Sequence, residues 1–162
     1  MKSLQRDNLK LKLELERTKE LLNLYRHDTL TGLKMRRDFE FRFTEMFESG
    51  VEFYLAMADV NGLHALNREE NFDAGDRLIK SVAHKFLENS NGIVYRIGGD
   101  EFVSLSLNAP ECVNSRDDNS YICAWVSSKN YKTEKTMFDA CDKKIIKGKE
   151  VYYAAKNNDR RV

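Results

Sequence analysis

The sequence predicts an α+β fold, in which helices flank a mostly antiparallel central sheet. Two observations lead to this prediction. The expected elements follow one another as helix, strand, helix, hairpin, strand and helix, an order typical of α+β domains. In addition, the pair Gly98-Gly99 separates two short apolar strands in the manner of a β-hairpin. With 162 residues, the chain can build one hydrophobic core but not two substantial ones.

Residues 1–27 are expected to form one charged amphipathic helix, and residues 28–162 the folded domain. A heptad seam runs along the helix, and six of its eight positions are apolar or aromatic. The seam comprises Met1, Leu4, Asn8, Leu11, Leu15, Thr18, Leu22 and Tyr25. It favours a two-stranded coiled coil. The alternative is a helix packed on its own domain through Leu9, Leu13, Leu21 and Leu24. Because no cap precedes the seam, we also hypothesise an upstream input domain.

The next segments alternate between turn, helix and strand. Asp28 or Thr29 can cap a short turn, and Gly32 permits a bend. Residues 35–48 carry apolar side chains at helical spacing, which predicts a helix facing the core. These side chains are Phe39, Phe43, Met46 and Phe47. Residues 51–60 (VEFYLAMADV) are β-branched and aromatic, so we expect a buried strand that ends at Asp59.

The second half of the chain predicts a helix, three strands and a final helix. The helix over 72–88 should face inward through Leu78, Ile79, Val82, Ala83, Phe86 and Leu87. Residues 93–97 and 101–107 form the hairpin strands, 108–120 a short loop, and 121–126 another strand. The last clear helix covers 133–147 and is expected to break or end near Gly148, with a basic helical tail to Val162.

Composition excludes several classes of protein. Lysine and arginine number 27 against 26 acidic residues, so a generic binder of nucleic acid or anionic membranes is not expected. No apolar run approaches a membrane span, and no signal-peptide pattern opens the chain. Three cysteines without CxxC spacing (Cys112, Cys123 and Cys141) argue against a disulfide framework or a zinc site. A cytoplasmic protein with reduced thiols is therefore expected.

Acidic residues gather at two predicted strand ends. Asp59 ends one strand, and Asp100 and Glu101 follow the double glycine. If these strands are neighbours, the carboxylates meet at one edge of the sheet and repel each other. A divalent cation relieves this repulsion, and Mg²⁺ prefers such oxygen ligands. Glycines without Cβ atoms also let the backbone approach a bulky ligand. Taken alone, however, these residues also fit a tight polar turn.

Four motifs in order resemble the GGDEF family of diguanylate cyclases. Residues 96–102 (RIGGDEF) carry the signature, and residues 28–37 (DTLTGLKMRR) resemble the opening motif. Asp59 to Asn67, followed by Gly75-Asp76, has the spacing of the metal and nucleotide segment. Cys141-Asp142 to Lys149 resembles the closing helix. The resemblance implies a fold like the palm of polymerases and nucleotidyl cyclases, and two GTP-loaded domains facing each other as a homodimer.

The resemblance also assigns roles to residues at matching positions. Asp59, the backbone carbonyl of Val60 and Asp100 would hold Mg²⁺ (or Mn²⁺), and Glu101 would be a metal-site residue or general base. Asn67 and Asp76 match the guanine readers, whose amide and carboxylate suit that base. The remaining positions would contact phosphate, namely Gly98, Gly99, His64 and Lys149.

Several positions depart from the family pattern. Asn61 replaces a second acid, Leu63 and His64 replace an aromatic and a lysine, and Asn71-Phe72 replaces Gly-His. Lys149 aligns with the phosphate-binding lysine, but Tyr153 takes the arginine position, and Lys156 and Arg160 are alternatives. Asn89 and Gly92 replace the RxxD product-inhibition motif. The family usually has a long helix where this chain has the 108–120 loop.

Two functions remain open at this point, with a third less favoured. The first is a metal-dependent diguanylate cyclase that condenses two GTP into cyclic di-GMP and two pyrophosphates. The second is a degenerate GGDEF domain without catalysis that acts as a GTP-binding or dimerisation module. A purely structural coiled-coil protein is the third, and the complete hairpin signature argues against it.

Overall fold

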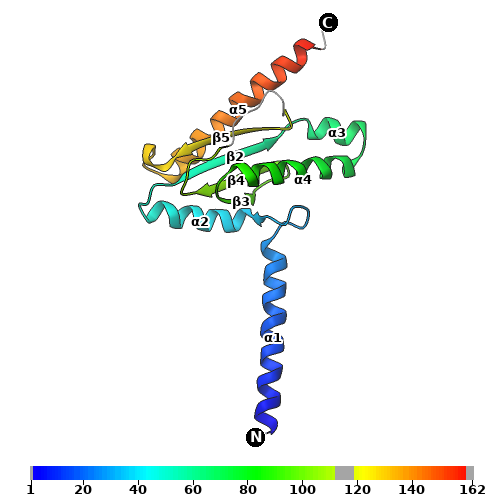
Figure 1. The fold of residues 1–162 in the computed structure, drawn as a ribbon, viewed down its shortest axis with the longest axis vertical. Helices are drawn as coiled ribbons and strands as arrows, with labels where there is room; N and C mark the ends of the chain where they lie inside the picture. The colour runs from blue at the N-terminus through cyan, green and yellow to red at the C-terminus, as the bar shows by residue number, and fades with distance from the viewer. Residues whose placement is uncertain (1, 112–118, 160–162) are drawn as a thin grey trace.

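The computed structural model describes residues 2–111 and 119–159. Its domain is a five-stranded sheet with helices on both faces, and a long N-terminal helix projects from it (Figure 1). The strands lie in the order β1-β3-β4-β2-β5, and all neighbours are antiparallel except β1 and β3. The predicted α+β class with a mostly antiparallel sheet is confirmed. None of the described helices has the length and apolarity needed to cross a bilayer.

The elements follow the predicted order with small shifts in their bounds. The strands are β1 (Lys34–Met35), β2 (Tyr54–Val60), β3 (Ile93–Arg96), β4 (Glu101–Ser106) and β5 (Tyr121–Ser127). The helices are α1 (Lys2–Arg26), α2 (Arg36–Glu48), α3 (Leu63–Glu69), α4 (Phe72–Asn89) and α5 (Glu134–Asp159), with a 3₁₀ turn, η1 (Ser128–Asn130), after β5.

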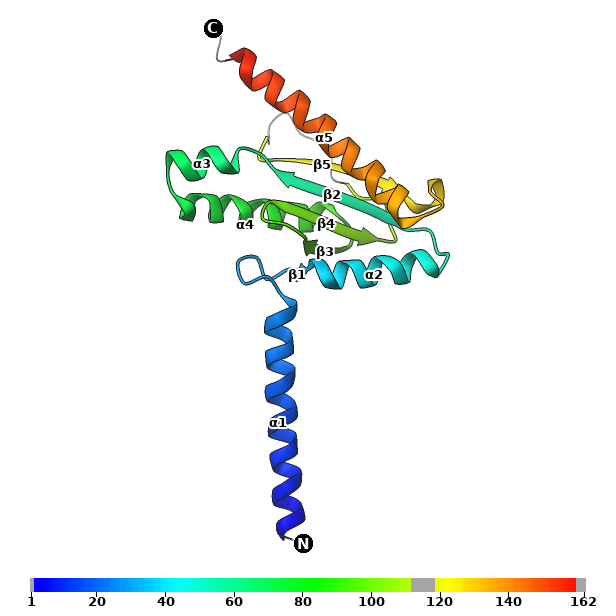
Figure 2. The ribbon, with the colours of Figure 1, turned by 180° about the vertical axis from the view of Figure 1, so that it is seen from behind.

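Two apolar cores lie on opposite faces of the sheet, which corrects the expectation of a single core. On one face, α2 and α5 pack against the strands through Phe39, Phe43, Met137 and Cys141. On the other face, α4 covers β2 and β4 through Ile79, Val82 and Phe86, as Figure 2 shows from behind. Phe86 is completely buried, and replacing such a phenylalanine with alanine typically costs about 3–5 kcal/mol.

Three details of the predicted helices are corrected. Leu87 was expected to face inward but is 45% exposed, because it lies at the edge of the apolar stripe of α4. Helix α5 does not break at Gly148 but continues through it. A Cβ atom there would lie 2.5 Å from Cγ2 of Ile122, so close packing on β5 explains this glycine. The 7-residue α3 was not predicted as a helix.

The N-terminal helix α1 leaves its apolar side chains in solvent. Leu9, Leu13 and Leu21, the stripe proposed to pack on the domain, are between 48% and 64% exposed. The alternative prediction, in which α1 packs on its own domain through this stripe, is therefore wrong. The heptad leucines Leu11 and Leu15 are equally exposed, so the seam is available to another chain.

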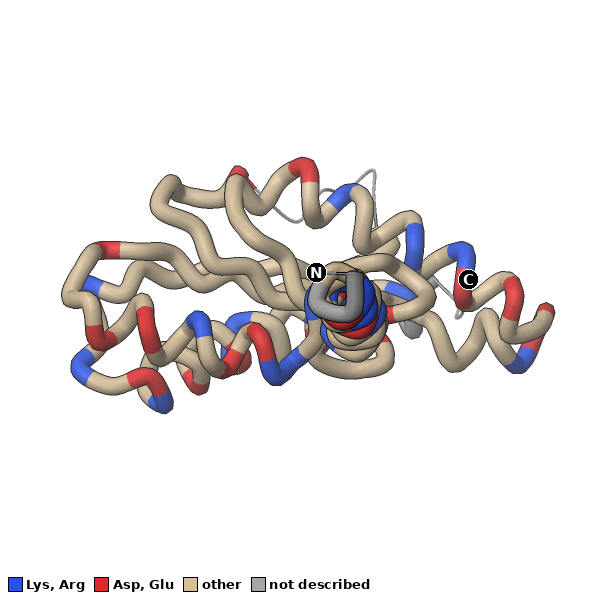
Figure 3. Tube along the Cα trace, turned by 90° about the horizontal axis from the view of Figure 1, so that it is seen from below, with Lys and Arg blue, Asp and Glu red and all other residues tan. Residues whose placement is uncertain are grey.

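Acidic and basic residues alternate along the chain in Figure 3, in keeping with the formal net charge of +1.

Candidate functional site

The predicted carboxylates lie together because β2 and β4 are neighbours. Asp59 on β2 stands opposite Glu101 on β4 in the antiparallel register. The backbone N–H of Val60 donates to the carbonyl oxygen of Asp100 at 3.0 Å, which extends the pairing beyond the strands. Directly opposed residues have Cβ atoms about 4.5–5.5 Å apart. Asp59, Asp100 and Glu101 therefore form one acidic cluster, called here the acid edge.

The carboxyl group of Asp59 is the most perturbed acid of this edge. Its side chain is 14% exposed and forms an ion pair with Lys149, which projects from α5. Burial is the main cause that raises the pKa of Asp59 to about 6; the charges of Asp100 and Glu101 act in the same direction, and Lys149 opposes them. The site therefore disfavours the charged form of Asp59 unless positive charge is added.

The donors of the acid edge suit a divalent metal ion that is completed by substrate. Among the described residues, no three His, Cys, Asp or Glu side chains are arranged as a metal cage. Mg²⁺ does not need one, because it typically takes one or two carboxylates together with waters and substrate phosphates. Asp59, Asp100 and the carbonyl of Val60 offer oxygen only. This donor set fits the ion, and Lys149 supplies a positive charge beside Asp59.

The two glycines of the hairpin differ in what surrounds them. The N–H groups of Ile97 and Gly98 both donate to the carbonyl oxygen of Glu101, at 2.9 and 3.4 Å. A Cβ atom on Gly98 would lie only 2.4 Å from Oε2 of Glu101, whereas one on Gly99 would meet nothing within 4 Å. Gly98 thus makes room for Glu101. The open space expected for a ligand lies over Gly99 alone.

Arg96, whose side chain is largely buried, links the hairpin to the opening turn through hydrogen bonds. Arg96 has a side chain 12% exposed, and its Nη1 lies 2.8 Å from Oδ1 of Asp28. Its Nη2 donates to the carbonyl oxygen of Gly99 at 2.6 Å. Burial raises the pKa of Asp28, but hydrogen bonds from Thr31 and Arg96 outweigh it and hold the pKa below its ordinary value. Arg96 thereby fixes the turn at Gly99.

A second arginine reaches the same hairpin from α2. Nε of Arg36 donates to the carbonyl oxygen of Ile97 at 2.8 Å, and Nη2 lies 3.9 Å from Oε2 of Glu101. Sequence reasoning gave neither Arg36 nor Arg96 a role. The position of Arg96 directly before the glycines was a usable signal, whereas the contact of Arg36 joins residues 61 positions apart.

The expected base-reading residues lie on the helix pair α3 and α4. Asn67 on α3 packs against Gly75 on α4, where a Cβ atom would lie 1.9 Å from Oδ1 of Asn67. That oxygen is buried and has no hydrogen-bond partner within the protein. Asp76 is exposed on α4, and His64 is exposed on α3. Figure 1 shows α3 and the beginning of α4 beyond the arrowhead end of β2, where the acid edge lies.

The basic residues expected at phosphate are separated along α5. Lys149 reaches the acid edge, whereas Lys156 is exposed two turns further on, and Arg160 lies outside the described residues. Tyr153, which takes the family's arginine position, is 44% exposed.

Two departures from the family pattern have structural explanations. Asn61 is 4% exposed, and its Nδ2 donates to the carbonyl oxygen of Asn119 at 3.0 Å, a bond that an ionised carboxylate could not donate. At Gly92, a Cβ atom would lie 2.3 Å from the carbonyl oxygen of Leu105. An aspartate at position 92, as in the RxxD motif, would clash with β4.

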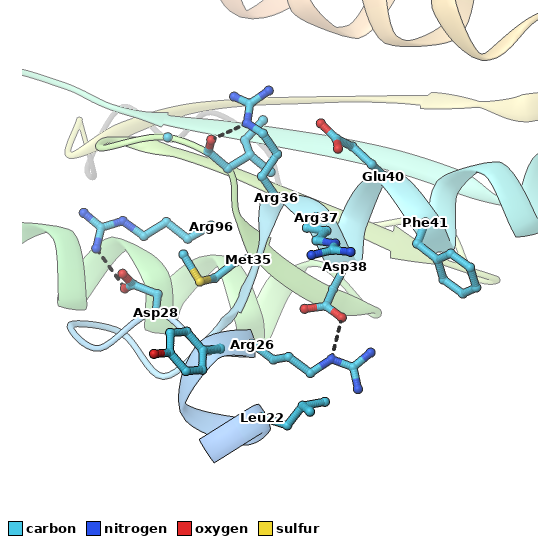
Figure 4. Close-up of a pocket in the computed structure, with 13 residues that line it drawn as sticks. Leu22, Arg26, Asp28, Met35, Arg36, Arg37, Asp38, Glu40, Phe41 and Arg96 are labelled. Carbon is cyan, nitrogen blue, oxygen red and sulfur yellow. Dashed lines mark hydrogen bonds and ion pairs between the residues drawn. The ribbon is translucent and has the colours of Figure 1, made fainter. Parts of the chain in front are cut away.

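A large cavity borders the hairpin without containing the acid edge. It measures about 1350 Å³ and lies between the end of α1, α2 and the hairpin (Figure 4). Its lining includes Ile97 and Gly98 but none of the three clustered carboxylates. Within it, Arg26 pairs with Asp38 and Arg96 with Asp28. The cavity is therefore separate from the acid edge.

Comparison with known proteins identifies relatives of this chain. Residues 25–135 match the model of the family "Diguanylate cyclase, GGDEF domain". Diguanylate cyclase VdcA of Vibrio cholerae is 31% identical over 100 residues, which cover 58% of this chain and 30% of that protein. An uncharacterized protein of Streptomyces griseus is 33% identical over 105 residues, covering 59% of this chain and 43% of that one. The chain thus spans less than half the length of these curated relatives.

Solved structures show the same fold at lower identity. The coiled coil and GGDEF domain of DgcB from Caulobacter crescentus, in complex with c-di-GMP, has a TM-score of 0.70 at 17% identity. That match covers 96% of this chain and 93% of the other. Diguanylate cyclase SiaD of Pseudomonas aeruginosa, in complex with its activator SiaC, has a TM-score of 0.60 at 22% identity, covering 93% and 70%. Since the family match extends over more than half of the sequence, the chain belongs to the GGDEF diguanylate cyclase domain family.

Proposed function

We propose that this protein is an active diguanylate cyclase that condenses two GTP molecules into cyclic di-GMP and two pyrophosphates, using two copies of the chain. The observation that supports this most strongly is the acid edge. Asp59 and Glu101 face each other across β2 and β4, and Asp100 follows the open turn at Gly99. All carboxylates that the reaction needs are thus present beside space for a phosphate.

The reaction proceeds by two equivalent transfers. The 3′-hydroxyl oxygen of one GTP bonds to the α-phosphorus of the other, and the bond to the leaving pyrophosphate breaks. A bound Mg²⁺ or Mn²⁺ supplies positive charge that neutralises the phosphate oxygens. Asp59, Asp100 and the Val60 carbonyl would hold this ion, and Glu101 would accept the hydroxyl proton. Lys149, which pairs with Asp59, would supply a further positive charge to phosphate.

The guanine base is read between α3 and α4 in this proposal. Oδ1 of Asn67 is buried without a protein partner, so it can accept from a base N–H group. Asp76 offers a carboxylate to the N1 and N2 donors of guanine. His64, exposed on α3, extends toward the phosphates.

Two copies meet through α1 in this proposal. Leu11 and Leu15 of the heptad seam are 63% and 54% exposed and would be buried in a coiled coil. The double variant Leu11→Glu/Leu15→Glu should lower both the sedimentation coefficient and turnover. The matched control Leu9→Glu/Leu13→Glu changes two equally exposed leucines outside the seam and should leave both unchanged.

The substrate and the thiols indicate where the protein acts. GTP is an intracellular nucleotide, and the thiols of Cys123 and Cys141 are buried, so we propose a cytoplasmic enzyme.

The ion pair between Lys149 and Asp59 favours a second candidate, a degenerate domain that binds GTP without turnover. Here Lys149 keeps the carboxylate from the metal. Calorimetry with GTP, combined with a turnover assay in Mg²⁺ or Mn²⁺, separates the two functions. Turnover that disappears in Asp100→Ala supports the cyclase, whereas binding without turnover supports the degenerate domain.

A further inference from the structure

Helix α4 carries an aromatic side chain on its core-facing side that has no core beneath it. Phe72, in the first turn, lies seven and eleven residues before Ile79 and Ala83, a spacing that places all three on one helix face. Ile79 and Ala83 are each 5% exposed beneath the sheet, whereas Phe72 is 78% exposed. The helix extends past the sheet at this end, as Figure 2 shows, and Phe72 in its first turn is exposed to solvent.

The position of Phe72 around α4 relates it to the two proposed base readers. Successive residues of a helix are rotated by about 100° around its axis. Viewed along the axis of α4, Phe72 therefore has an angular position between those of Gly75 and Asp76. Gly75 is the residue against which the amide of Asn67 packs. Asp76 is one turn after Phe72, at a separation that makes side chains neighbours. An apolar residue thus has an angular position between an amide with an unpartnered oxygen and an exposed carboxylate.

From this arrangement we propose that Phe72 is a substrate-binding residue that stacks on the face of the purine base of the nucleotide. This inference rests on the proposed nucleotide-binding function. The edge of a purine needs hydrogen-bonding groups, which Asn67 and Asp76 supply, and its face needs an apolar surface. A flat ring against Phe72 would remove the most exposed phenylalanine of α4 from water.

The division between face and edge gives separable effects on binding. A ring that stacks on a base does so with any purine. The loss of Phe72 should therefore weaken the binding of GTP and of ATP by the same factor. The loss of Asp76 should instead reduce the preference for GTP over ATP. Pyrophosphate has no base, and its affinity should not depend on Phe72.

The test measures dissociation constants of the full chain for GTP, ATP and pyrophosphate in Mg²⁺. For Phe72→Ala we expect a 5- to 150-fold weaker affinity for both nucleotides, an unchanged GTP/ATP ratio and unchanged pyrophosphate binding. Phe72→Trp should bind within twofold of the wild type, and Phe72→Leu should lie between the two. Phe41→Ala removes a ring 67% exposed on α2 and is the matched control without effect.

Two results would overturn this inference while leaving the proposed function intact. One is GTP affinity of Phe72→Ala within twofold of the wild type, and the other is an equal loss for pyrophosphate. If the wild type binds neither nucleotide, the proposed function fails and this inference with it. Because Phe72 is 78% exposed, Phe72→Ala should unfold at the wild-type temperature, which separates lost stacking from lost structure.

Discussion

Replacement of Asp59 with asparagine should stabilise the metal-free protein. The carboxyl of Asp59 has a pKa of about 6 in the fold against an ordinary value of 3.8. At 1.36 kcal/mol per pKa unit, the fold disfavours the ionised form by at most about 3 kcal/mol. Screening by solvent reduces this figure, and we expect Asp59→Asn to raise the free energy of unfolding by about 1–2 kcal/mol at pH 8.

The sign of the effect follows from proton binding. Between pH 4 and 6 the unfolded chain loses its proton from Asp59 while the folded chain retains it, so the wild type loses stability over this window. Below pH 4 both states are neutral at this position, and the two proteins should converge. Above pH 6 the gap should be constant.

Urea unfolding, followed by the fluorescence of Trp125 in EDTA from pH 4 to 8, measures this gap. Asp28→Asn is the opposite control, because hydrogen bonds hold the pKa of Asp28 below its ordinary value and its contribution is lost as pH falls. Addition of Mg²⁺ with GTP should reverse the order of stability at pH 8, so that the wild type becomes more stable than Asp59→Asn. A gap independent of pH, or an asparagine variant less stable at pH 8, would refute the reasoning.

Three further substitutions test other parts of the structure. Gly75→Ala should displace Asn67, because the new Cβ atom would lie 1.9 Å from Oδ1 of Asn67. We expect at least fivefold weaker GTP binding in calorimetry, and unchanged binding would contradict this packing. Arg96→Ala removes the hydrogen bonds to Asp28 and to the carbonyl oxygen of Gly99. It should lower the free energy of unfolding in urea by about 1.5–3 kcal/mol, and a change below about 0.5 kcal/mol would show that these bonds are dispensable. Asn61→Asp should destabilise by about 1–3 kcal/mol, because it replaces a buried donor with an acceptor facing a carbonyl oxygen, and an equally stable variant would count against this bond.

Patterns of period two and 3.6 made most of the sheet and helices predictable. Residues 51–60 and 101–107 are apolar enough to require burial, and the double glycine required a turn between β3 and β4. The pairing of β2 with β4 was only a condition in the sequence argument, and the structure shows that it is met. This pairing brings Asp59, Asp100 and Glu101 to one edge, which the sequence analysis expected only if the two strands were neighbours. The helix over 36–48 was equally clear, because its phenylalanines repeat at helical spacing.

Features that depend on tertiary contacts were not predictable. Gly148 lowers helix propensity, but α5 continues through it because the glycine fits against Ile122. The two-residue β1 exists through its pairing with β3 and has no pattern of its own. Likewise, the ion pair of Lys149 with Asp59 joins residues 90 positions apart, and the sequence indicated only a phosphate contact for the lysine.

The ratio of pyrophosphate to cyclic dinucleotide tests the proposed activity most directly. Purified full-length protein at high concentration is incubated with GTP and Mg²⁺ or Mn²⁺, and both products are quantified by chromatography. The proposal predicts two pyrophosphates for each cyclic di-GMP, with neither product formed by Asp100→Ala. GTP binding without either product from the wild type would contradict it.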